Sequence, residues 1–189
     1  MFACMAHIAR LGPIPPSLKI TLFSACVRSV LLYGADAIPL SKGQGDLLDD
    51  VPMHYTRWSL RLSKTSNRAD TLIETGQVPL SVTAAQARVK YFVLTQSRRQ
   101  DHVATDVLRE LTSLKARSRR RGWVNLVEQS LEVWECDREK LGQLPDLSRR
   151  RHKSSRAVTS EYISDKAVAW WQRQATAPPA DKPTPSWLA

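Results

Sequence analysis

The chain has 189 residues, of which 42% are hydrophobic, so it is long enough to bury a core of its own. Its 28 Lys and Arg residues exceed its 18 Asp and Glu residues, and the net charge of +10 favours a polyanionic partner such as nucleic acid. Its 7 glycines and 7% aromatic residues argue against a barrel or sandwich built on tight turns, and its 3 isolated cysteines exclude a disulfide framework. Such cysteine usage fits a reducing, intracellular compartment.

The first predicted helix follows the start signal Pro15-Pro16-Ser17 and ends at Gly34, because glycine suits the left-handed end of a helix. Its predicted core face carries apolar residues at helical spacing, which are Ile20, Phe23, Val27, Val30 and Leu31. Charged and polar residues interrupt this stretch, and it is too short for a membrane span. We therefore expect no membrane partner.

The next predicted helices are read from the same periodicity and from their end signals. One carries the apolar residues Leu47, Val51, Tyr55, Trp58 and Leu62. Pro52 within it is predicted either to kink the helix or to mark a restart. Asn67 is expected to cap a short helix that runs through Glu74 and stops at Gly76. Pro79-Leu80-Ser81 then opens a helix whose predicted core face is Val82, Ala85, Val89 and Phe92.

Three further stretches continue the helical pattern toward the C-terminus. Their apolar positions are Val103, Val107, Leu111 and Leu114, then Trp123, Leu126 or Val127, Ser130 or Leu131, and Trp134, and finally Val158, Tyr162 and Ala167 to Trp171. No two-residue alternation and no Asn-Gly or Asp-Gly hairpin signal is found. The prediction is an all-α fold, an irregular bundle of about seven helices with a disordered Pro-rich C-terminal tail. We expect a helical region at 1–97, a basic helical extension at 98–176 and the tail at 177–189.

No catalytic or metal-binding pattern is recognised in the sequence. The four histidines, His7, His54, His102 and His152, lie at no ligand spacing to one another or to a cysteine, and no GxSxG, P-loop or dinucleotide-binding pattern occurs. Asp49 and Asp50 form a pair of the kind that binds Mg²⁺ in polymerases, but such a pair needs a third carboxylate from a separate apolar strand. We interpret the pair as a solvated helix start. No metal, no cofactor and no catalytic residue is therefore expected.

Positive charge is concentrated in the middle of the chain, where residues 98–156 hold 15 basic and 9 acidic residues, a net of +6. The predicted nucleic-acid-binding residues lie there in two clusters, the first of Lys115, Arg117, Arg119, Arg120 and Arg121 and the second of Arg149, Arg150, Arg151 and Lys153. Arginine presents planar donors that match phosphate, and several together release counterions on binding. The same residues could instead act as a nuclear-targeting signal or be a solvated surface.

Two segments in the first half of the chain resemble a known family. The run ARLGPIPPSLKITLFSACVRSVLLYGAD, followed by LIETGQVPLSVTAAQARVKY, resembles the helical region just downstream of the polymerase palm in reverse transcriptases of non-LTR (LINE-type) retrotransposons. The matching residues are Tyr33, Gly34, Ala35, Glu74, Gly76, Pro79 and Leu80, and the likeness extends from Ala9 to Val93. The chain departs from the family at Asp36, where Glu is commoner, and at Ile38-Pro39, which replace a Trp-containing end.

The resemblance implies a truncated thumb or linker segment of an RNA-directed DNA polymerase, a region that holds template–primer and RNA. The family's palm strands and Tyr-x-Asp-Asp motif are not found in the sequence, so binding is expected without polymerisation. The implied partners are the backbone of RNA or DNA, without sequence preference, and a separate polymerase domain. An intracellular location is expected, with the nucleus as one destination. The alternative is a helical protein-interaction module, or a co-opted remnant, with no nucleic-acid role.

Overall fold

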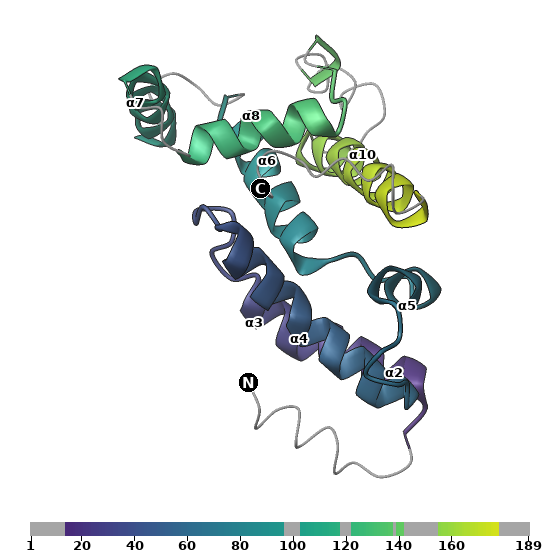
Figure 1. Ribbon diagram of the computed structural model, residues 1–189. Helices are drawn as coiled ribbons and strands as arrows, with labels where there is room; N and C mark the ends of the chain where they lie inside the picture. The colour runs from purple at the N-terminus through teal and green to yellow at the C-terminus, as the bar shows by residue number, and fades with distance from the viewer. Residues whose placement is uncertain (1–13, 97–102, 118–121, 138, 142–154, 178–189) are drawn as a thin grey trace. The chain divides into compact units, whose positions relative to one another are not determined.

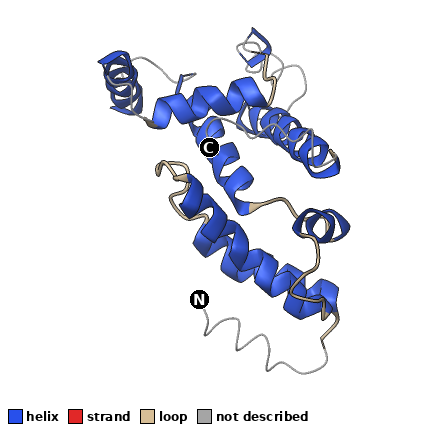
Figure 2. Cartoon of the chain, in the orientation of Figure 1, coloured by secondary structure: helices blue, strands red, loops and turns tan. Residues whose placement is uncertain are grey.

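A computed structural model describes residues 14–96, 103–117, 122–137, 139–141 and 155–177. The regular elements in these residues are helices and none is a strand (Figure 2), which confirms the predicted all-α class. In chain order they are α2 (Pro16–Phe23), the π-helical turn η1 (Ser24–Arg28), α3 (Ser29–Leu31), α4 (Lys42–Leu60), α5 (Arg68–Glu74), α6 (Leu80–Gln96), α7 (Val103–Arg117), α8 (Trp123–Val133) and α10 (Ser155–Thr176) (Figure 1). None of these described helices combines the length and the apolarity that crossing a membrane requires.

The chain divides into two compact units. One consists of Met1–Gly34 and Leu40–Thr83, and the other of Ala35–Pro39 and Ala84–Ala189. The domain boundary predicted at residue 97 and the tail from residue 178 onward lie outside the described residues, so both stay predictions.

The first helical segment comprises α2, η1 and α3, and it has the ends that the sequence predicts. Pro16 occupies the first turn of α2, where its missing N–H costs no hydrogen bond. Gly34 follows α3 with a φ of +70°, a left-handed conformation that glycine adopts without a steric penalty. The start and stop signals in the sequence therefore predict this segment correctly.

The π-helical turn changes which side chains of this segment are buried. Phe23 and Val27 are 1% and 3% exposed, as predicted, but Val30 is 71% exposed. A π-helical turn contains more residues than an α-helical turn, so the residues after η1 are rotated about the helix axis relative to regular spacing. As a result Leu31 packs against the core formed by Phe23, Val27 and Tyr55. The prediction that Val30 faces the core is wrong for this reason.

Helix α4 begins earlier than its apolar pattern predicts. Ser41 caps it through a capping box, in which the Ser41 side chain accepts from the Gln44 N–H and the Gln44 side chain accepts from the Ser41 N–H. The helix then runs through Pro52 to Leu60 without interruption.

The buried face of α4 also differs from the predicted one. Leu47, Trp58 and Leu62 are 68%, 44% and 38% exposed, whereas the buried residues are Gly45, Pro52, Met53, Tyr55, Thr56 and Ser59. The reason is that α4 has neighbours on more than one side. Its Tyr55 contacts the first helical segment, and its Thr56 accepts a hydrogen bond from buried Gln77 at 3.0 Å. A helix covered on several sides buries small and polar residues that a single apolar stripe does not include.

Helices α5 and α6 agree closely with the sequence prediction. The Asn67 side chain accepts from the Ala69 N–H at 2.9 Å and so caps α5, which ends at Glu74 before Gly76 with a φ of +64°. The four residues predicted to form the core face of α6 are all buried, and they are Val82, Ala85, Val89 and Phe92.

The second unit is formed mainly by α8, α10 and most of α6. Most of the predicted core residues of α8 and α10 are buried, and these are Leu126, Val127, Ser130, Leu131, Trp134, Val158, Ala167 and Trp170. The prediction fails for the others, because Trp123, Tyr162, Val168 and Trp171 are only half-buried and Ala169 is exposed. The Trp123 indole N–H donates to the Asp36 carbonyl at 2.8 Å, which joins the Ala35–Pro39 segment to α8. Helix α7 is the exception, because Val103 and Val107 are 74% and 53% exposed and Leu108 is buried in their place.

The first prediction concerns the core contact of Phe23. Replacing Phe23 with Ala removes a fully buried ring that stacks on Tyr55 at a centroid distance of 4.4 Å, and should lower the free energy of unfolding by about 3–5 kcal/mol. Val30→Ala, in the same helical segment, is the matched control and should change it by less than about 0.5 kcal/mol. Urea denaturation followed by circular dichroism measures both. If both variants lost the same unfolding free energy, Val30 would face the core as Phe23 does, and the rotation assigned to the π-helical turn would be wrong.

Candidate nucleic-acid interface

The two basic clusters predicted from the sequence fall mostly outside the described residues. Lys115 and Arg117 belong to the last turn of α7, but their side chains are not described, and residues 118–121 and 142–154 are not described at all. Phosphate contact by the nine predicted residues stays a prediction.

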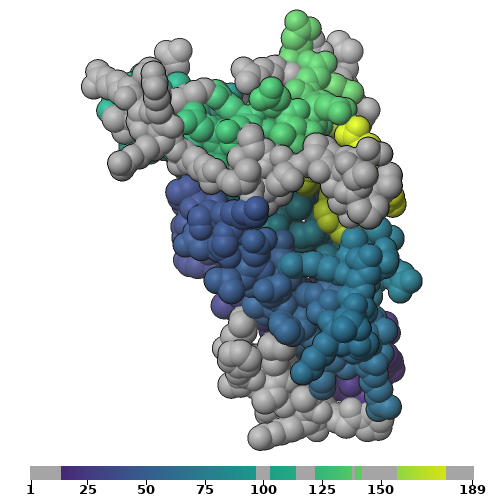
Figure 3. Space-filling model, in the orientation of Figure 1, coloured from purple at the N-terminus to yellow at the C-terminus, as the bar shows by residue number. Residues whose placement is uncertain are grey.

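A second basic segment does lie in the described part of the chain, in the first unit. From Val51 to Ala69 the sequence contains Arg57, Arg61, Lys64 and Arg68 and no Asp or Glu. Figure 3 shows the blue atoms of α4 and of the segment after it as a continuous surface on the face drawn. Because the four cations are spread along the sequence, a search for contiguous basic runs does not detect them. The 19-residue stretch without an acid is the signal that could have revealed them.

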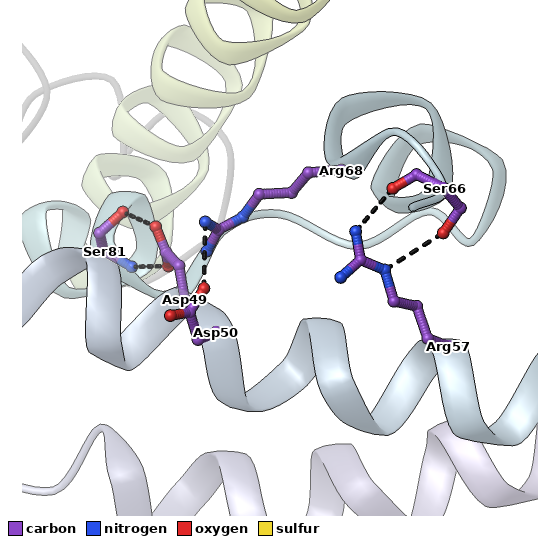
Figure 4. A network of polar contacts seen from close by, with 6 residues as sticks. All are labelled: Asp49, Asp50, Arg57, Ser66, Arg68 and Ser81. Atoms are coloured by element: carbon purple, nitrogen blue, oxygen red, sulfur yellow. Dashed lines mark hydrogen bonds and ion pairs between the residues drawn. The ribbon is translucent and has the colours of Figure 1, made fainter. Parts of the chain in front are cut away.

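Two of these four cations have structural contacts (Figure 4). The Arg57 guanidinium donates to the Ser66 hydroxyl at 3.1 Å and to the Ser66 carbonyl at 2.6 Å, which ties the loop after α4 back onto the helix. Arg68 forms an ion pair with Asp50 at 3.3 Å. No carboxylate partner is found among the described residues for the other two, Arg61 and Lys64, and both are exposed.

An exposed aromatic residue, Trp58, precedes Arg61 and Lys64 by three and six residues in the chain. Trp58, in the last turn of α4, is 44% exposed. The Lys19 ammonium lies 4.8 Å from the centre of its ring, and the Tyr55 ring is tilted against it at a centroid distance of 5.5 Å. Exposed tryptophan beside cations is a combination found where proteins stack bases and contact phosphates.

Two other arginines are directed inward and do not contribute to a surface. Arg28 is partly buried, donates to the Thr83 hydroxyl at 2.8 Å, and has a guanidinium pKa lowered by burial. Arg88, in the second unit, is 5% exposed, and its Nε and Nη1 atoms meet no hydrogen-bond partner in the described structure. Burial lowers its pKa as well. At 5% exposure Arg88 is inaccessible to a surface-bound phosphate.

The aspartate pair has a different role from the one the sequence suggests. Asp49 accepts the Ser81 N–H at 2.7 Å and the Ser81 hydroxyl at 2.5 Å, so it satisfies a free donor in the first turn of α6 (Figure 4). It lies in the middle of α4, which begins at Lys42, and it is partly buried. The interpretation of the pair as a solvated helix start is therefore wrong. Within the described ranges, no three His, Cys, Asp or Glu residues are grouped so that they could hold a metal ion.

Comparison with known proteins finds no matching family model, no similar curated protein and no similar solved structure.

The second prediction concerns the Asp49 carboxyl, whose pKa is raised by desolvation even though Ser81 and Arg68 lower it in part. Its folded-state pKa lies above the unfolded value of about 4. The folded state therefore binds the proton more tightly, and the associated stability is lost as the pH rises through the folded pKa. Asp49→Asn does not titrate and keeps an oxygen that can accept from the Ser81 N–H. The unfolding free energy of the natural chain minus that of Asp49→Asn should therefore fall as the pH rises from about 4 to 7.

The control for this measurement is Asp49→Ala, which loses both hydrogen bonds to Ser81. It should be less stable than Asp49→Asn at every pH, by about 1–2 kcal/mol, the usual cost of losing a helix cap. If the unfolding free energy of the natural chain minus that of Asp49→Asn rose with pH instead, the fold would favour the ionised carboxylate. Burial would then not be the dominant influence on the Asp49 pKa.

Proposed function

We propose that this chain is a nucleic-acid-binding helical segment that does not itself catalyse polymerisation. The observation that carries the proposal is the distribution of charge. The net charge is +10, and it includes a run of arginines at 119–121 and a stretch from 51 to 69 without any acid. Such segments attract phosphate backbones through counterion release, without reading sequence.

The resemblance to the post-palm helices of non-LTR retrotransposon reverse transcriptases supports the same function. Two of the glycines on which the resemblance rests, Gly34 and Gly76, have positive φ and end helical segments. Glycine adopts such a conformation with the least strain, which gives a physical reason for part of the pattern. In that family the region contacts template–primer, and for this chain we propose the corresponding contact with RNA or DNA backbone, inside the cell and beside a polymerase domain.

A second candidate function is favoured by helix α7. Its Val103 and Val107 lie one turn apart and are 74% and 53% exposed. Exposed apolar residues on one face of an amphipathic helix are typical of a protein-binding surface. A helical protein-interaction module would use this face, and its positive charge would serve solubility. The two candidates differ in how binding to nucleic acid depends on salt.

The third prediction tests the proposed function by that salt dependence. Binding of the natural chain to single-stranded and duplex oligonucleotides should be insensitive to sequence and should weaken steeply with salt. When the logarithm of the binding constant is plotted against the logarithm of the salt concentration, each phosphate contact contributes a slope of about −0.7 on single strands and about −0.9 on duplex. Neutralising Arg119, Arg120 and Arg121 together should flatten the slope by about two to three if all three contact phosphates.

The matched control neutralises three cations that lie apart from the clusters, which are the exposed residues Lys42, Arg109 and Arg173. It removes the same total charge and should flatten the slope by less than the cluster variant does. Fluorescence anisotropy at several salt concentrations gives the slopes. Equal slopes for the natural chain and the cluster variant, with weak binding throughout, would favour the interaction module.

A further inference from the structure

Trp58 is held in a fixed position in the first unit and yet remains open to solvent. Its ring contacts Tyr55 on one side, and the Lys19 ammonium lies over it at 4.8 Å. Nevertheless 44% of the residue is exposed. Leu62, four residues later in the chain, is 38% exposed.

Three cations lie over the ring or follow Trp58 closely in the chain: Lys19 is over the ring, and Arg61 and Lys64 come three and six residues after it. Lys19, Arg61 and Lys64 form no ion pair with a described carboxylate, whereas Arg57 and Arg68 have contacts within the fold. The three unpaired cations are thus free to interact with an anionic ligand. We name Trp58, Lys19, Arg61 and Lys64 the Trp58 platform.

We propose that the Trp58 platform binds single-stranded nucleic acid, with one unpaired base stacked on the Trp58 ring and the three cations contacting the flanking phosphates. The proposal rests on the proposed function and adds to it a preference for single strands. A base in a duplex is already stacked between its neighbours and must be unstacked before it can lie on a protein ring. An unpaired base needs no such step, and every base has a face that can stack.

The position of Lys19 over the ring is compatible with this binding. A cation–π contact at an exposed site is weaker than the stacking of a base on an aromatic side chain. A base can therefore displace the ammonium from the ring, and the freed ammonium then lies close to the phosphates on either side of that base. Charge and aromatic surface thus act on the same nucleotide.

The experiment measures binding of the full chain to a fluorescein-labelled oligothymidylate and to a duplex of equal length. Trp58→Ala should weaken binding to the oligothymidylate by about 5-fold to 150-fold, the range for loss of one stacked base, and should leave duplex binding nearly unchanged. Trp58→Phe keeps a stacking ring and should retain most of the affinity. Tyr33→Ala is the matched control, because Tyr33 is an aromatic residue of the same unit that is 90% exposed, and it should bind as the natural chain does.

A second variant tests the cations without disturbing the fold. Arg61 has a φ of +55°, a left-handed conformation that glycine adopts more easily than arginine. Arg61→Gly therefore preserves the turn at the end of α4 and removes the guanidinium. It should make the dependence of oligothymidylate binding on salt less steep, by about 0.7 in the slope of log binding constant against log salt concentration, the value for one phosphate contact on a single strand.

A contact measurement on the natural chain gives an answer even if Trp58→Ala fails to fold. Ultraviolet irradiation of the complex with a bromodeoxyuridine-substituted strand, followed by mass spectrometry, should identify a cross-linked peptide that contains Trp58. Cross-links confined to other peptides would overturn the proposal.

The remaining outcomes separate this proposal from the proposed function. If the natural chain binds oligothymidylate and Trp58→Ala binds it equally well, the platform is refuted and nucleic-acid binding stands. If polyglutamate competes as effectively as unlabelled oligothymidylate, the surface recognises charge alone and the stacking proposal is wrong. If the natural chain binds neither oligonucleotide at low salt, both proposals fail.

Discussion

The arrangement of the first unit depends on Tyr55, which joins the first helical segment to α4. Its ring stacks on Phe23 at a centroid distance of 4.4 Å, and its hydroxyl donates to the Lys19 carbonyl at 2.8 Å. A buried tyrosine is stabilised when its hydroxyl finds a partner, so the two contacts together fix the position of the first segment along α4. Trp58 follows Tyr55 by about one helical turn, and the same contacts bring the Lys19 ammonium over its ring. The core and the candidate binding surface therefore share one buried residue.

Sequence periodicity predicts helices well where each helix buries one face and has clear end signals. This holds for α5, with Asn67 and Gly76 at its ends, and for the core face of α6. It fails where a helix departs from regular geometry or is covered on several sides. A π-helical turn cannot be inferred from residue spacing, so Val30 is assigned to the core and lies in solvent. The early start of α4 could have been predicted from the Ser41 and Gln44 capping box, but its buried face depends on partners distant in sequence.

The candidate site is predictable from the sequence only in part, for similar physical reasons. Contiguous arginines are recognised directly, since their number in a short segment indicates a polyanionic partner. The Trp58 platform combines residues from α2, from α4 and from the segment after α4, and Lys19 reaches Trp58 because of packing that residue spacing does not reveal. Periodicity assigns Trp58 to the core, and its exposure becomes evident from the structure. Likewise, the environment of Asp49 depends on Ser81, which belongs to a different helix.

Both proposals together require that nucleic acid contact the segment after α4 and the basic run at residues 119–121. Hydrogen–deuterium exchange of the natural chain, with and without a saturating single-stranded oligonucleotide, tests this most directly. Amides of the loop after α4 have few backbone hydrogen bonds in the structure and should exchange quickly in the free chain. The account predicts slower exchange in peptides that cover residues 61–69 and 115–121 when the oligonucleotide is bound. Unchanged exchange in both segments, or protection confined to the exposed valine face of α7, would contradict it.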